Sequence, residues 1–241
     1  MKLSNGNNAW GQATRCLHSG SLVDGRSTGL VTPLYSATAF AYLDVADFAY
    51  PRNFNVPNQK VLVDKICALE GAEDGLVFSS GMGAIFTTLL GLLSPGDHAI
   101  FQNDLYGGTH YAITSELTRM GIHYTFIDQV DLESLENACH EKTKLVYIET
   151  PSNPLLNIID MELVADWARK HGIISCIDNT FASPVNQNPI AHGIDVVMHS
   201  ATKYLGGHSD LSAGAVVASA EIIEPIRHAA VNMGAVLNAQ V

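Results

Sequence analysis

Short apolar runs alternate with amphipathic stretches along the chain after residue 57. Continuous apolar runs are typical of strands buried on both faces, and the amphipathic stretches between them are typical of helices. This order predicts an α/β fold in which a mostly parallel seven-stranded sheet lies between helices. We expect strands at 75–78, 98–101, 123–127, 144–148, 173–177, 194–198 and 213–218, and helices at 82–93, 108–120, 132–139, 161–171 and 221–232.

Two of the helices carry end signals. The stretch 161–171 has the clearest helical pattern, and Asp160 precedes it at the position of an N-cap. A further helix begins near Asn58 and is expected to end at Gly71, because glycine adopts the left-handed conformation that ends many helices.

Residues 1–57 differ from the rest of the chain. They carry scattered Gly, Ser, Asn and Pro and little periodicity, so we expect an extended arm that is buried against another molecule. This predicts two parts, an arm at 1–57 and one large domain at 58–241, and it indicates an oligomer. Tyr50 and Arg52 stand near the end of the arm, where a solvated loop is the simpler interpretation of the residues alone.

Composition and charge exclude several classes of function. The chain has 241 residues, 47% of them hydrophobic, with a net charge of −11 and no densely basic window, so no nucleic-acid partner is expected. No apolar run approaches the roughly 20 residues that span a bilayer, and the N-terminus lacks the apolar segment of a signal peptide. We therefore expect no membrane association and a cytoplasmic location. The four cysteines lie far apart, which indicates neither disulfides nor a zinc site.

Polar residues with chemical potential follow several expected strands. Lys203 lies in the stretch Ser200–His208, and a lysine shielded from water can act as an amine nucleophile. The stretch Ser79–Gly83 is a glycine turn that opens a helix, which suits a phosphate group. Tyr106, Asn153 and Asp178 follow or end other strands. Singly, each of these residues is as readily explained as a turn or capping residue.

Together these features favour pyridoxal phosphate as a cofactor. Lys203 would form a Schiff base with it, and Asp178 would keep the pyridine nitrogen protonated. Tyr106 would stack on the ring, and the helix start with Ser200 and Thr202 would hold the phosphate. An alternative, a nucleotide-binding Rossmann protein, rests only on the glycine turn.

Six motifs resemble the Cys/Met-metabolism branch of fold-type I pyridoxal phosphate enzymes, and the resemblance runs from about Thr14 to the end of the chain. This family includes cystathionine γ-synthase, cystathionine β- and γ-lyases, methionine γ-lyase and O-acetylhomoserine sulfhydrylase. The motifs are YPR, SSGMGA, DLYGGTH, ETPSNPLL, DNTFASP and SATKYLGGHSD.

The resemblance implies a role for each matching residue. Lys203 and Tyr106 would be the catalytic residues, with Lys203 bound to the cofactor and moving protons between substrate carbons. Asn153 would lie near the ring hydroxyl, and Tyr50 and Arg52 would reach the phosphate in a neighbouring subunit of a homotetramer. The full set implied to bind the cofactor is Lys203, Asp178, Tyr106, Gly81, Met82, Ser200, Thr202, Asn153, Thr180, Tyr50 and Arg52.

The resemblance also implies a reaction: β- or γ-elimination, or γ-replacement, on a sulfur-containing or O-acylated amino acid, as in trans-sulfuration. Gly107 follows the tyrosine, and Gly108 stands where methionine γ-lyases have a cysteine, which disfavours that activity. Members of the family continue from a helix like 231–241 into a smaller domain with an arginine for the substrate carboxylate. We expect that domain to be absent, so a non-catalytic cofactor-binding fragment or scaffold is the alternative function.

Two smaller expectations concern polar residues near these motifs. The segment 50–58 reads YPRNFNVPN where the family has YxRxxNPT, so the phosphate contacts there are less well defined. His199 and His208 flank the lysine stretch and are expected to serve turns or neighbouring side chains, with no metal bound.

Overall fold

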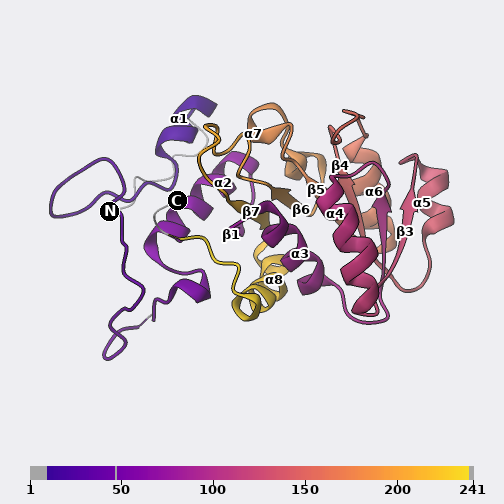
Figure 1. The fold of residues 1–241 in the computed structure, drawn as a ribbon. Helices are drawn as coiled ribbons and strands as arrows, with labels where there is room; N and C mark the ends of the chain where they lie inside the picture. The colour runs from indigo at the N-terminus through magenta and orange to yellow at the C-terminus, as the bar shows by residue number, and fades with distance from the viewer. Residues whose placement is uncertain (1–9, 47, 239–241) are drawn as a thin grey trace.

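The computed structural model describes residues 10–46 and 48–238 and contains a seven-stranded sheet between helices (Figure 1). The strand order is β1-β7-β6-β5-β4-β2-β3. Strands β6, β5, β4, β2 and β3 are parallel, whereas β7 runs antiparallel to both of its neighbours, β1 and β6. The strands are β1 Asp74–Phe78, β2 His98–Gln102, β3 His123–Ile127, β4 Thr143–Glu149, β5 Ile174–Asp178, β6 Val196–His199 and β7 Gly214–Ala218.

Helices cover both faces of this sheet. The longer ones are α2 Pro57–Glu70, α3 Gly81–Leu92, α5 Leu132–Ala138, α6 Met161–His171 and α8 Ala220–Met233. The shorter ones are α1 Gln12–His18, α4 Gly107–Tyr111, α7 Ser183–Asn186, the π-helical turn η2 Ala112–Leu117, and the 3₁₀ turns η1 Pro51–Asn53 and η3 Pro189–His192. One apolar core joins the sheet to α3, η2 and α8, and a second joins its other face to α2, α5 and α6. Side chains that alternate between the two faces of each strand supply both cores.

The predicted strands and most predicted helices are confirmed, with boundaries that differ by one or two residues. The side chain of Asp160 caps α6 by accepting a hydrogen bond from Leu163 N, and Gly71 ends α2 in the left-handed conformation with φ of 80°. The helix expected at 108–120 is divided between α4 and η2.

The helix expected at 231–241 is confirmed only as far as Met233 and is wrong for the described residues that follow. Helix α8 ends at Met233, and Gly234 with φ of 73° turns the chain so that Val236 bridges to Phe78. The remaining residues, 239–241, lie outside the described ranges.

Residues 10–46 and 48–56 mostly lack regular structure, apart from α1 and η1, which the sequence pattern did not predict. Lys65 on α2 holds α1 in place, because its Nζ donates to the carbonyl oxygens of Cys16 and Leu17, each at 3.0 Å. Leu30 and Val31 of the arm are exposed. Across the described ranges, no helix combines the length and the apolar character needed to cross a membrane.

Candidate functional site

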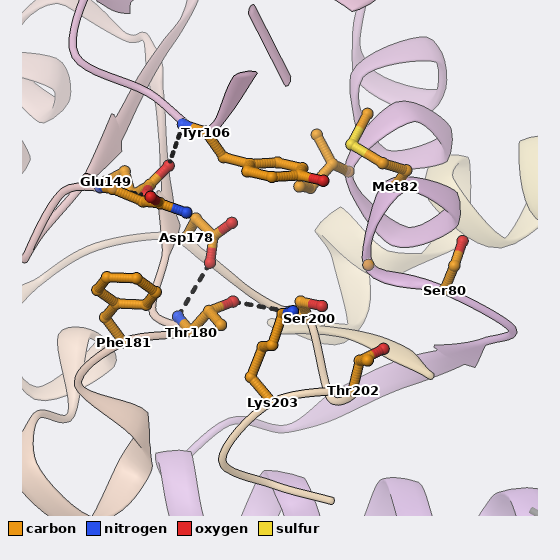
Figure 2. A pocket seen from close by; sticks show the side chains of 13 residues that line it. Ser80, Met82, Tyr106, Glu149, Asp178, Thr180, Phe181, Ser200, Thr202 and Lys203 are labelled. Atoms are coloured by element: carbon orange, nitrogen blue, oxygen red, sulfur yellow. Dashed lines mark hydrogen bonds between the residues drawn. The ribbon is translucent and has the colours of Figure 1, made fainter. Parts of the chain in front are cut away.

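A cavity of about 260 Å³ lies where β4, β5 and β6 end and α3 begins. Carboxyl ends of parallel strands are the usual place for a ligand in an open α/β sheet. Nine of the residues predicted from the sequence are brought together there (Figure 2). They are Gly81, Met82, Tyr106, Asn153, Asp178, Thr180, Ser200, Thr202 and Lys203.

The start of α3 forms one wall of the cavity. Ser80 caps the helix, because its Oγ accepts a hydrogen bond from Gly83 N at 3.0 Å. Gly81 lets the helix start approach β6 closely: a Cβ at this position would lie only 2.6 Å from Ser200 Cβ. The first-turn N–H groups of a helix have no intrahelical acceptor, so this wall offers hydrogen-bond donors to an anion.

Thr202 closes the turn that carries the lysine. Its Oγ1 donates to Ala213 O at 3.1 Å and accepts from Ala213 N at 3.0 Å. Lys203 N donates to Ser200 O, and Gly207 N donates to Lys203 O, so the turn has a defined shape. The Lys203 side chain is exposed, and within the described ranges its amine makes no hydrogen bond or ion pair.

Asp178 ends β5 and is only 5% exposed. Burial raises the pKa of Asp178 above its ordinary value, while hydrogen bonding to Thr180 and the charge of His199 act in the opposite direction. Thr180 N donates to Asp178 Oδ1 at 2.9 Å, and Ser200 N donates to Thr180 Oγ1 at 2.7 Å. In the part of the chain that the structure describes, Asp178 takes part in no ion pair, so a cationic ligand group would offset the cost of its burial.

Glu149 is a buried cavity residue that sequence reasoning missed. Its Oε2 accepts from Tyr106 N at 2.9 Å and its Oε1 from Asn153 N at 2.8 Å, so one carboxyl group anchors two of the predicted residues. Burial, and secondarily the charge of Asp178, raise the pKa of Glu149 to about 8. The available signal was its position at the end of a strand, immediately before the Thr-Pro-Ser-Asn-Pro turn.

Ile85 and Phe181 also line the cavity and were missed, and Ser80 lines it within the stretch Ser79–Gly83 that was expected to suit a phosphate. Tyr106 is 46% exposed, and its ring lies against Gly108, where an added Cβ would come within 2.6 Å of Tyr106 Cε1. Figure 2 shows this ring beside Asp178, on the opposite side from Lys203.

Tyr50 and Arg52 do not line the cavity of their own chain. Arg52 Nη1 donates to Val231 O at 3.1 Å, and its guanidinium lies 5.7 Å from the centre of the Tyr50 ring. His199 and His208 make contacts with protein groups: His199 bonds to Glu70, and His208 Nδ1 lies 3.1 Å from Gly206 O. Among the described residues, no cluster of three or more His, Cys, Asp and Glu side chains could hold a metal ion.

The sheet order, the lysine turn and the buried strand-end carboxylate define an α/β protein with a polar ligand cavity at its strand ends. The family model of Cys/Met metabolism PLP-dependent enzymes matches residues 13–241. The chain belongs to this family, whose members depend on pyridoxal phosphate.

Named relatives and a solved structure agree with this membership. The chain is 42% identical over 213 residues to a probable cystathionine gamma-synthase of Herpetosiphon aurantiacus, covering 87% of this chain and 66% of that protein. It is 41% identical to the cystathionine gamma-lyase of Bacillus subtilis, covering 94% of this chain and 60% of that protein. The crystal structure of metB from Corynebacterium glutamicum matches with a TM-score of 0.92 and 36% identity, covering 97% of this chain and 62% of that one.

The chain therefore spans about 60 to 66% of the length of the curated relatives that it matches. The nearly equal identities to a synthase and a lyase mean that overall similarity does not select one reaction.

Proposed function

We propose that the chain binds pyridoxal phosphate in this cavity and takes part in β- or γ-elimination, or γ-replacement, on sulfur-containing or O-acylated amino acids. The observation that carries the proposal is that Asp178 and Lys203 line the same cavity. Among the described residues, the buried Asp178 carboxylate has no ion-pair partner, which suits a protonated pyridine nitrogen, and the Lys203 amine has no hydrogen-bond or ion-pair partner, which suits an aldehyde carbon.

The other lining residues fit the same cofactor. Tyr106 presents a ring face to the cavity, and Asn153 lies in the loop that Glu149 anchors. Thr180 orients the Asp178 carboxylate through its backbone N–H. Gly81 and Met82 at the start of α3, together with Ser200 and Thr202, supply donors for the phosphate, although the Thr202 hydroxyl already bonds to Ala213.

When bound, pyridoxal phosphate supplies an electron sink for charge that develops at the α-carbon of an amino acid. The chain's own contribution centres on the Nζ atom of Lys203, which holds the cofactor and accepts or returns a proton at the substrate carbons. Tyr106 acts beside it as the second catalytic group. The Asp178 carboxylate would stabilise a positive charge on the bound cofactor, and the burial of Asp178 strengthens this electrostatic attraction.

The substrate would be a small amino acid of trans-sulfuration. Named relatives support both synthase and lyase chemistry, being a probable cystathionine gamma-synthase and a cystathionine gamma-lyase. The four cysteines are free thiols, which supports a reducing compartment such as the cytoplasm.

We also propose that the protein is a homo-oligomer, a dimer of dimers, in which residues 1–57 form an arm and the following residues form the cofactor domain. Exposed apolar side chains on the arm support burial against another copy, as do the positions of Tyr50 and Arg52 outside their own cavity. In the oligomer, Tyr50 and Arg52 would complete the phosphate site of the neighbouring subunit.

An absorbance titration with pyridoxal phosphate, followed by assays for ketoacid release from cystathionine, methionine and cysteine, tests the proposal. A yellow complex that releases ketoacid supports the catalytic function. A yellow complex without turnover supports a cofactor-binding scaffold, and no colour with excess cofactor contradicts the site assignment.

A further inference from the structure

A buried carboxylate lies behind the cavity and bonds to both strand ends that carry cofactor residues. Glu70, the last residue of α2, places Oε1 2.6 Å from His199 Nε2 and 2.8 Å from Asn179 Nδ2. The Glu70 side chain is 0% exposed and that of His199 is 1% exposed. A carboxylate only accepts hydrogen bonds, so both neighbours donate to the same oxygen.

The residues bonded to Glu70 alternate with residues that line the cavity. Asp178, Thr180 and Ser200 line it, whereas Asn179 and His199, which lie between or next to them in sequence, bond to Glu70. This division follows from the opposite directions of successive side chains in extended backbone.

Hydrogen bonds on the cavity side complete the connection. Thr180 N donates to Asp178, Ser200 N donates to the Thr180 hydroxyl, and Asn179 N donates to Met198 O. The ends of β5 and β6 are therefore joined through Thr180 in front and through Glu70 behind.

The network extends to the loop that carries Asn153. Gln187 Nε2 donates to Asn179 Oδ1 and to Thr150 O, both at 2.9 Å. No group in the described ranges donates a hydrogen bond to the buried Glu70 Oε2, in contrast, so α2 ends in a carboxylate whose burial carries an energetic cost. The cost is offset by the donors of Asn179 and His199, and the charge of His199 in turn opposes the effect of burial on the pKa of Asp178.

We propose that Glu70 is a positioning residue of the cofactor site, which fixes Asp178 and Ser200 relative to each other by clamping Asn179 and His199. The inference rests on the proposed function, because it assigns Asp178 and Ser200 to the ring nitrogen and the phosphate of pyridoxal phosphate. Glu70 itself does not line the cavity.

Two substitutions at Glu70 separate the effect of its charge from the effect of its acceptor oxygens. Glu70→Gln leaves an acceptor oxygen of the same shape but removes the charge, which weakens both hydrogen bonds. Glu70→Met removes both acceptor oxygens, so His199 Nε2 and one N–H of Asn179 Nδ2 lose their acceptor, while Asn179 Nδ2 still donates to Gln187 O at 3.1 Å.

Asp195→Asn is a matched control at the opposite end of the same two strands. Asp195 Oδ2 accepts from Ser175 N at 2.9 Å and from Ser175 Oγ at 2.8 Å, so it also joins the β6 side to β5. It lies away from the cavity. A general loss of stability would appear in Asp195→Asn as well, whereas a loss of positioning would not.

Three readouts apply to the full chain: amide hydrogen exchange at Thr180 and Ser200 without cofactor, the dissociation constant for pyridoxal phosphate, and the visible circular dichroism of the bound cofactor. We expect Glu70→Met to weaken binding by about tenfold or more, since two buried N–H groups lose their acceptor. We expect Glu70→Gln to weaken it by about fivefold, the difference between a charged and a neutral acceptor. Both variants should exchange faster at the two amides and alter the dichroism.

Asp195→Asn should retain wild-type affinity, dichroism and exchange at Thr180 and Ser200. The proposal is overturned if Glu70→Gln matches the wild type in all three readouts, or if Asp195→Asn shows the same changes as Glu70→Gln. Should Glu70→Met fail to fold, Glu70→Gln alone decides between these outcomes. A wild-type chain that binds no pyridoxal phosphate contradicts the proposed function instead, and the exchange measurement then still tests the clamp.

Discussion

Glu149 and Asp178 occupy paired positions at the ends of the neighbouring parallel strands β4 and β5, so two buried carboxyl groups lie side by side at one edge of the sheet. Each strand delivers its carboxyl group to the same cavity. The charge of Asp178 disfavours ionisation of Glu149, in addition to the effect of burial on the Glu149 pKa. The pair therefore favours one neutral and one charged carboxyl group, with Glu149 as the neutral partner.

The Glu149 pKa predicts how stability depends on pH. It is about 8 in the folded chain against an ordinary 4.5, so unfolding releases a proton between these two values. The contribution of Glu149 to stability is complete below pH 4.5 and is lost as pH rises to about 8. We expect Glu149→Gln to remove this decline, whose maximum slope is about 1.4 kcal/mol per pH unit. Urea unfolding of the cofactor-free chain between pH 5 and pH 8.5 measures it, and an unchanged pH dependence in Glu149→Gln would contradict this account.

The Asp178 carboxylate is expected to lower the stability of the cofactor-free chain and to strengthen the binding of pyridoxal phosphate. Because burial raises the pKa of Asp178, its charged form is costly in the cofactor-free chain, and Asp178→Asn should stabilise that chain at neutral pH. The same substitution should raise the dissociation constant for pyridoxal phosphate tenfold or more, which corresponds to a loss of about 1.4 kcal/mol or more of binding free energy. Thermal unfolding and equilibrium dialysis check the two effects. Equal or tighter cofactor binding by Asp178→Asn would show that this carboxylate does not face the ring nitrogen.

Two adjacent glycines provide a matched pair at the start of α4. A Cβ at Gly108 would lie 2.6 Å from Tyr106 Cε1 and 3.2 Å from Met82 Sδ, whereas a Cβ at Gly107 would meet nothing within 4 Å. We expect Gly108→Ala to displace the Tyr106 ring and weaken cofactor binding by about tenfold, from roughly 1–3 kcal/mol of steric strain. Gly107→Ala should bind like the wild type. Similar affinities for the two variants would mean that the Tyr106 ring does not contact the cofactor.

The burial of His98, at the end of the sheet away from the cavity, predicts that the folded chain loses stability in acid. His98 is buried at the start of β2, with Nδ1 2.9 Å from Thr143 Oγ1 and Nε2 2.9 Å from Thr125 Oγ1. Burial, and then the charges of His140 and His123, lower the pKa of His98 to about 4 from an ordinary 6.5. The folded chain keeps His98 neutral, so its contribution to stability is complete above pH 6.5 and is lost as pH falls to about 4.

The His98→Gln variant tests this assignment. It should lose stability at pH 7.5 through its altered hydrogen bonds, yet lose less than the wild type on going from pH 7.5 to pH 4.5. Thermal unfolding at both pH values provides the comparison. A parallel decline in the two proteins would place the acid sensitivity elsewhere.

The sheet and much of the cavity could be predicted because their signals are local. Apolar runs mark strands buried on both faces, and polar residues at the ends of such runs meet at one edge of a parallel sheet. Asp178, Tyr106 and Lys203 were found in this way.

The missed features depend on partners that are distant in sequence. Glu149 resembles an ordinary strand-end residue until β5 places Asp178 beside it. Glu70 resembles an exposed helix-end carboxylate, and its burial depends on His199 and Asn179, more than a hundred residues away. Helix α1 was missed because its position depends on Lys65 of α2 and its own pattern is weak.

The central claim is that Lys203 is the residue to which the cofactor binds, and it can be measured directly. The chain is incubated with pyridoxal phosphate, reduced with borohydride, digested and mapped by mass spectrometry, with Lys203→Ala treated in parallel. The account predicts stoichiometric modification of Lys203 in the wild type and none at the equivalent peptide in Lys203→Ala. Modification that is absent, or spread over surface lysines such as Lys142 and Lys170 in both proteins alike, would contradict it.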